Sequence, residues 1–363
     1  MTDATETIEP DPLNTPQSAS SEELPCLTAG LAGIGGVLKE RSEDFLVEEI
    51  PAYLPTGSGE FLYLWIEKQD LSAEQLTSHL AKFLKIAHQD VGMAGLKDRQ
   101  AITRQWVSVP ARCEPLLTEV RHEQIRVLEA QRHGNKLRTG HLRGNRFSIL
   151  LRSVTPDAVK RATAIADELR QTGVPNYFGE QRFGRDNETL ELGFGLLRGE
   201  RRPGQIPHAR RKFLLRLALS AVQSHLFNQA LAARIRAGTI HTAQPGDVMQ
   251  VVASGGPFVV EDPAREQPRL DQHEIVVSGP IFGPKMKFPS GEVAEHESEL
   301  LKSAGLDLDA FTRFANLTPG TRRPYLIWID DLQLAKEGNG LRLSFRLPSG
   351  SYATVVLREF QKN

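Results

Sequence analysis

The chain has 363 residues, of which 40% are hydrophobic and 25% are charged, and its formal net charge is -1 at pH 7. This composition is ordinary for a globular protein with a sizeable core, and the length suits two domains or one large domain with an insertion. A net charge this close to zero excludes a protein that attracts nucleic acid through its total charge. No apolar run approaches the roughly 20 residues that are needed to span a bilayer.

The first residues are rich in Thr, Ser, Pro, Glu and Gln. Such a composition buries too little apolar surface to offset chain entropy, so we predict a disordered tail over residues 1–25 and order from near Gly35. The acidic start lacks an apolar stretch and is not a signal peptide. Cys26 and Cys113 lie far apart without a metal-type spacing, which indicates a reducing compartment. We therefore expect a cytoplasmic protein.

The first half predicts a sheet with one early helix. Strands over residues 45–50 and 61–66 flank the turn-prone run 55–59. A helix follows, because Ser72 and Gln75 form a capping box and apolar residues then recur on one helical face. Further strands are expected over residues 105–109, 124–128 and 146–151.

Helices dominate the middle of the chain. Thr155 before Pro156 predicts a helix start, and Gly173 its end. A further helix is expected over residues 212–236. Between residues 246 and 324, Gly and Pro are frequent and strands look short, which indicates a separate module with a helix over residues 295–304.

Regular strands return at the end of the chain. They are predicted over residues 325–332 and 341–347, with the Asn339-Gly340 hairpin signal between them. Ser351 is expected to cap a last helix. Strands from both ends of the chain can pair in one sheet, which would leave the middle as an insertion.

The run Gly95–Gln105 carries the strongest chemical signal. Asp98 lies between Lys97 and Arg99, follows a glycine closely and leads into a strand. A carboxylate between cations is expected to be ionised at neutral pH and can act as a nucleophile on a polyanionic substrate. A solvated surface turn would carry the same triplet, so the assignment depends on the neighbouring motifs.

Two basic clusters indicate contact with a phosphate backbone, although the formal net charge of the chain is only -1. The first covers residues 121–152, and the second covers residues 198–216. Solvated loop charge is the alternative for both.

Three further stretches combine residues that suit a nucleobase. Asn145 and Phe147 share one face of a strand and can hydrogen-bond and stack a base. Residues 174–184 hold three aromatic residues, two glycines and an arginine, which suits single-stranded or flipped bases. Lys39 precedes the first long strand and can reach into a site beside it. A turn, a packed loop and a solvated strand end are the structural alternatives.

Together these stretches resemble the tRNA pseudouridine synthase D family, which forms pseudouridine at position 13 of tRNA. The resemblance also includes residues 43–49, 220–228, 245–248 and 347–354. It implies an α/β fold (α+β type) with a central, mainly antiparallel sheet over residues 36–173 and 326–363, and an inserted α/β module over residues 174–325. It further implies a monomer without metal or organic cofactor.

The resemblance also assigns the site. It places the catalytic aspartate at Asp98 and active-site positions at Lys39, Asn145 and Phe147. Tyr352 stands where the family usually has Phe, which leaves stacking on a base plausible. Lys39 or Arg99 would keep the Asp98 carboxylate ionised beside its RNA substrate.

Two other function classes remain open at this stage. A non-catalytic RNA-binding protein or chaperone would use the same basic patches and aromatic residues. A glycosidase normally needs two carboxylates facing one bond, and Glu48, Glu49 or Glu180 would have to supply the second. Nothing in the spacing places any of them opposite Asp98.

Overall fold

The computed structural model describes residues 24–329 and 331–362. The tail predicted over residues 1–25 therefore lies almost wholly outside the described residues. The prediction that order begins near Gly35 is wrong, because Ile34 is fully buried and the backbone nitrogens of Leu27 and Thr28 donate to the Glu359 carboxylate at 2.9 and 3.1 Å. The segment that precedes the first strand is thus hydrogen-bonded to the last helix of the chain.

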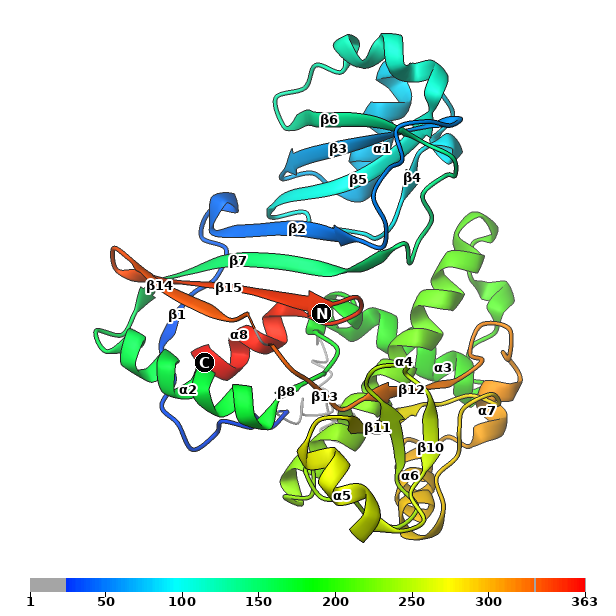
Figure 1. The fold of residues 1–363 in the computed structure, drawn as a ribbon. Coiled ribbons are helices and arrows are strands. Elements are labelled where there is room, and N and C mark those ends of the chain that lie inside the picture. Colours follow the sequence, from blue (N-terminus) through cyan, green and yellow to red (C-terminus); the bar gives the residue numbers. More distant parts are fainter. Residues whose placement is uncertain (1–23, 330, 363) are drawn as a thin grey trace, which may run out of the picture.

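A nine-stranded sheet, here called the large sheet, is the framework of the molecule (Figure 1). Its strands run in the order β14-β15-β7-β2-β5-β3-β6, while β1 pairs with β7 and β4 with β5. Every pair is antiparallel except β2–β5. The predicted α/β class with a mainly antiparallel central sheet is confirmed. The strands are β1 (Gly35–Val37), β2 (Phe45–Pro51), β3 (Phe61–Gln69), β4 (Gly92–Met93), β5 (Ile102–Pro110), β6 (Ile125–His133), β7 (Leu142–Val154), β14 (Gln333–Glu337) and β15 (Gly340–Pro348).

Three helices cover one face of the large sheet. Alternate strand residues are apolar on that face, as expected for strands with one covered side. α1 (Ala73–Phe83) packs on β3 and β5, while α2 (Ala158–Thr172) and α8 (Ala353–Gln361) pack on β7 and β15. The face between these two covered areas holds β2 and the start of β5. That middle zone carries the candidate site.

A second unit lies below the large sheet in Figure 1. Its sheet, here called the small sheet, has four strands in the order β10-β9-β11-β12. The chain leaves the large sheet at β8 (Val174–Pro175) and returns at β13 (Leu326–Ile327), and these two segments pair with each other. The domain limits proposed from the sequence stay a prediction. The other elements are α3 (Glu188–Arg198), α4 (His208–Arg236), β9 (Val248–Val251), β10 (Pro257–Val259), α5 (Pro263–Asp271), β11 (Ile275–Ile281), α6 (Gly291–Ser303), α7 (Leu308–Thr312) and β12 (Thr321–Pro324).

Local sequence signals give mixed results. The capping box is confirmed, since Ser72 Oγ accepts from the Gln75 nitrogen at 3.1 Å and Gln75 Oε1 accepts from the Ser72 nitrogen at 2.9 Å. The predicted start of α2 is wrong, because Asp157 is the N-cap and Pro156 stays outside the helix. α8 likewise takes Tyr352 as N-cap, not Ser351, and has no side-chain cap.

The last hairpin is shifted from its prediction. Glu337 pairs with Gly340, so Gly338 and Asn339 form the turn, with Gly338 at φ 57°. Of the strand expected over residues 325–332, the described residues form only β13, and β14 begins beyond that range at Gln333. No helix within residues 24–329 and 331–362 combines the length and apolarity that crossing a membrane requires.

Candidate active site

Asp98 lies in the loop between β4 and β5, at the edge of the middle zone of the large sheet. Its side chain is 41% exposed, and its Oδ2 lies 3.6 Å from Lys39 Nζ. Lys39 comes from the segment before β2, so a parallel pair of neighbouring strands, β2 and β5, brings both residues together at the same end of the sheet. The carboxylate is therefore both reachable and paired with a cation.

The loop that carries Lys39 is held by several contacts. Lys39 has φ 57°, in the left-handed region, and its ammonium lies 4.2 Å from the centroid of the Phe45 ring. Asp44 accepts two hydrogen bonds from Arg152, at 2.6 and 2.7 Å, and one from the Arg41 nitrogen at 3.0 Å. The hydrogen bonds from Arg152 lower the pKa of Asp44, so this anchor stays ionised at neutral pH.

The two cations beside Asp98 in sequence have other positions. Lys97 turns inward and donates to Glu49 Oε2 at 2.7 Å, with both side chains buried. Burial raises the pKa of Glu49, and Lys97 offsets part of that rise. Arg99 is exposed and forms no ion pair with a described residue. Of the two cations proposed to face Asp98, the structure thus pairs Lys39 with it and leaves Arg99 open to solvent.

Sequence reasoning missed Lys68 of β3. Its side chain has no exposed surface, and its Nζ donates to the backbone oxygen of Leu71 at 2.6 Å and of Asp98 at 2.9 Å. A signal was present, because Lys68 continues the alternation of Leu62, Leu64 and Ile66 on the covered face of the strand.

Asn145 and Phe147 lie on β7, inside the strand and not at its head. Phe147 is 6% exposed, and its ring packs between Phe45 and Phe345 at centroid distances of 6.3 and 5.6 Å. Asn145 sits opposite Glu49 on β2, and its buried Oδ1 accepts no hydrogen bond from the described residues. A buried acceptor of this kind is suited to a donor group of a ligand.

Tyr352 lies in a different part of the site, after the loop that follows β15. Its ring meets Phe178 edge-on at 6.0 Å. The loop is tied down by Asn176, whose Oδ1 accepts from Ser351 Oγ at 3.0 Å and from Arg323 at 2.5 Å. No hydrogen bond, ion pair or ring contact joins Tyr352 to Asp98 directly. Its loop nevertheless begins beside Asn145, since Leu347 and Asn145 are register partners.

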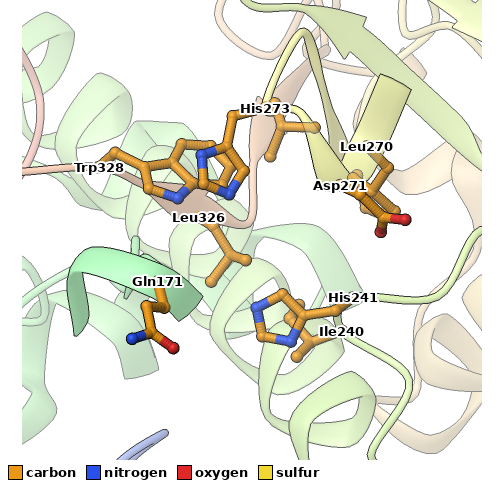
Figure 2. A pocket seen from close by; sticks show the side chains of 10 residues that line it. Gln171, Ile240, His241, Leu270, Asp271, His273, Leu326 and Trp328 are labelled. Atoms are coloured by element: carbon orange, nitrogen blue, oxygen red, sulfur yellow. The ribbon is translucent and has the colours of Figure 1, made fainter. Parts of the chain in front are cut away.

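Two hollows of the molecule are lined by other residues. One, of about 180 Å³, lies where α2, α5 and β11 meet, and Figure 2 shows Trp328 and His273 side by side at its rim. The other, of about 270 Å³, lies beside Arg201 and Arg202. Neither of these two hollows includes Asp98 or Lys39 in its lining. No group of three His, Cys, Asp or Glu side chains in the described part of the chain has a metal-binding arrangement.

The start of α4 is a strongly basic surface. The helix has 29 residues and contains no Asp or Glu, and all of its buried residues lie from Ala218 onward. Arg210, Lys212 and Arg216 are exposed and form no ion pair with a described residue, and Phe213 between them is 65% exposed. We call residues 208–217 the α4 basic surface. Cations with an exposed aromatic ring suit a nucleic-acid backbone and its bases.

Comparisons with known proteins agree over nearly the whole chain. The sequence profile of the family "tRNA pseudouridine synthase D (TruD)" matches residues 23–203 and 208–360. A tRNA pseudouridine synthase D from Anaeromyxobacter dehalogenans strain 2CP-C is 44% identical over 340 residues, which cover 94% of this chain and 97% of that protein. A tRNA pseudouridine synthase D from Thermus thermophilus is 40% identical over 342 residues, covering 94% and 93%.

A solved structure gives the same picture at the level of fold. The crystal structure of a putative tRNA pseudouridine synthase D from Methanosarcina mazei superimposes with a TM-score of 0.73 at 25% identity. The match covers 93% of this chain and 95% of that one.

Proposed function

This chain belongs to the tRNA pseudouridine synthase D family, and we propose that it converts the uridine at position 13 of tRNA to pseudouridine with Asp98 as the catalytic residue. The family and its relatives make the chain a tRNA pseudouridine synthase, an isomerase. The observation that carries the assignment of Asp98 is its partly exposed carboxylate, held against Lys39 on an anchored loop.

The reaction needs no external reactant, because substrate and product are isomers. The N1–C1′ bond of uridine breaks, the base turns, and a C5–C1′ bond forms. The proton on C5 leaves, and N1 gains one. A carboxylate can start this sequence by attacking the sugar or the base, or by removing the 2′ proton to give a glycal. In each case Lys39 is the cation that lies beside the carboxylate, with its Nζ 3.6 Å from Asp98 Oδ2.

The other assigned residues would handle the base. A uridine inside the tRNA fold must be flipped out at a cost of a few kcal/mol, and contacts in the site offset that cost. We assign hydrogen bonding of the base edge to Asn145 and stacking to Tyr352, with Phe147 supporting the site from beneath. Leu96, 80% exposed two residues before Asp98, adds apolar surface beside the carboxylate.

The phosphate backbone would be held outside the reacting centre. Arg99 is exposed beside Asp98 and suits a phosphate next to the flipped nucleotide. The α4 basic surface offers a second contact. Such cations attract RNA without reading its sequence, so they support binding of a folded tRNA as a whole.

The competing readings find less support. A glycosidase would need a second free carboxylate beside Asp98. Glu49 forms an ion pair with Lys97, and Glu48 pairs with Arg104 and Arg146. No hydrogen bond or ion pair among the described residues joins the exposed Glu180 to the Asp98 loop. A non-catalytic RNA-binding protein would not need a carboxylate paired with a cation on an anchored loop.

The test is mass-spectrometric mapping of pseudouridine in tRNA incubated with purified wild-type protein and with D98N. Wild-type protein should modify position 13, and a tRNA with cytidine there should stay unmodified. D98N should give no product while its affinity for tRNA stays within about threefold, because a neutral isostere keeps the shape of the site. D90N, eight residues earlier, is the matched control and should be fully active.

Two results would overturn the proposal. Turnover by D98N at the wild-type rate would remove Asp98 from catalysis. Tight tRNA binding by a wild-type protein that forms no pseudouridine would favour the RNA-binding reading.

A further inference from the structure

Lys68 is a fully buried cation that forms no ion pair with any described residue. Its ammonium instead donates to two backbone oxygens, of Leu71 at 2.6 Å and of Asp98 at 2.9 Å. Lysine is almost never fully buried unless it is paired, because removing a charge from water is costly. A charge kept in such a place points to a role other than stability.

The electrostatic surroundings of Lys68 are dominated by the Asp98 loop. Burial lowers the pKa of Lys68 to about 8, the charges of Asp98 and Asp70 act against that fall, and Lys97 adds to it. These three are the charged groups that face it. Its neighbours across the sheet, Thr103 on β5 and Ile125 on β6, carry no charge. At neutral pH the Lys68 side chain is still mainly protonated, and a small rise in pH removes the proton from a growing share of the molecules.

Two lysine side chains connect the Asp98 loop to the large sheet. Lys68 holds the backbone of Asp98, and Lys97, the preceding residue, is held by Glu49 at 2.7 Å. Between these anchors the sheet offers polar groups without partners, since Thr103 Oγ1 and both amide atoms of Gln105 are buried and form no hydrogen bond with the described residues. The two lysines thus supply side-chain anchors of the loop, in addition to the backbone hydrogen bonds that Gly140 and Asp70 donate to Ala94 and Ala101 at 2.8 and 3.3 Å.

We propose that Lys68 is a positioning residue for the reaction: its ammonium fixes the backbone of Asp98 and places a second positive charge behind the carboxylate that Lys39 faces from the front. This inference rests on the proposed role of Asp98. A purely structural tether would need the hydrogen bonds but not the charge, and the two roles differ in how the rate responds to pH.

The test is the single-turnover rate of pseudouridine formation between pH 6 and pH 10, with tRNA affinity measured at each pH. At pH 7, K68M should be about 30- to 100-fold slower than wild type, with tRNA affinity within about threefold, because a small displacement of a catalytic group has effects of this size. The wild-type rate should fall as pH rises through about 8, where the ammonium loses its proton. K68M should lack that decline. K82M, the same change at an exposed lysine of α1, should behave as wild type.

Several outcomes decide the matter. A K68M rate within about threefold of wild type at pH 7, or the same alkaline decline in both proteins, would remove Lys68 from catalysis. If K68M does not fold by near-ultraviolet circular dichroism, the wild-type profile decides: a decline near pH 8 at constant tRNA affinity supports the inference, and a flat rate to pH 9.5 overturns it. A wild-type protein without any product would refute the proposed function itself, and this inference would fall with it.

Discussion

Arg323 donates a hydrogen bond of 2.9 Å to the backbone oxygen of Gly350, in the loop that leads to Tyr352. The same guanidinium donates to the backbone oxygen of Asn176 at 3.1 Å and lies 4.2 Å from the centroid of the Phe178 ring. Burial lowers the pKa of Arg323 only to about 10, so it stays charged at neutral pH. One side chain at the end of β12 thus links the small sheet, the segment after β8 and the Tyr352 loop.

This relationship predicts that R323M impairs catalysis from a distance. The Tyr352 loop loses one of its anchors, so the single-turnover rate should fall by about tenfold, with a smaller change in tRNA affinity. Stability should fall by about 2–3 kcal/mol, because hydrogen bonds from a charged donor are lost. R323K should recover little, since an ammonium cannot reproduce the planar fork. R265M, at an exposed arginine of α5, is the control, and a rate equal in R323M and wild type would contradict the argument.

Two substitutions of Lys39 separate the effect of its backbone strain on stability from the effect of its charge on the rate. Its φ of 57° suits glycine, so K39G should change stability by no more than about 1 kcal/mol, whereas K39M keeps the strained backbone. Both variants remove the ammonium 3.6 Å from Asp98 and should lower the rate by about 100-fold. Denaturant unfolding and single-turnover kinetics measure the two effects. A K39G protein as fast as wild type would show that the ion pair has no part in the reaction.

The sequence predicts the framework well where local signals agree with packing. The capping box of α1 and the alternation of β3 and β15 are short-range features that tertiary contacts reinforce. The start of α2 fails because Pro156 fits the turn before the helix as well as its first position. The last hairpin shifts because Gly338 and Gly340 both flank Asn339, and local turn chemistry does not choose between two registers.

The site was only partly readable for a different reason. Asp98 and Lys39 were found through motifs, but which cation faces Asp98 depends on strand pairing, and Lys97 turned inward to Glu49. Lys68 and Arg323 were missed because they act through backbone oxygens far away in sequence. The sequence signal for Lys68 was its position in β3, where it follows the alternation of the buried residues.

The α4 basic surface predicts a salt-dependent contribution to tRNA binding. Replacing Arg210, Lys212 and Arg216 by Gln should make the plot of log affinity against log salt shallower by about 2 to 3, since each phosphate contact contributes about 0.9. The rate at saturating tRNA should stay within about twofold, because the surface does not include the Asp98 loop. The same change at the exposed cations Lys160, Arg265 and Lys302 is the control. An unchanged salt slope would show that RNA does not touch this surface.

The buried ammonium of Lys68 predicts an unusual pH dependence of stability. Its pKa is about 8 in the folded protein and 10.5 is its ordinary value, so between these values the unfolded chain binds more protons than the folded one. Stability therefore rises with pH in this window, by up to about 1.4 kcal/mol per pH unit for one proton. The free energy of unfolding of wild type, measured relative to K68M, should increase by about 2 kcal/mol from pH 8 to pH 10. Other groups that titrate there are present in both proteins and cancel in the difference. Parallel curves would mean that Lys68 keeps an ordinary pKa, and the decline in rate would then need another titrating group.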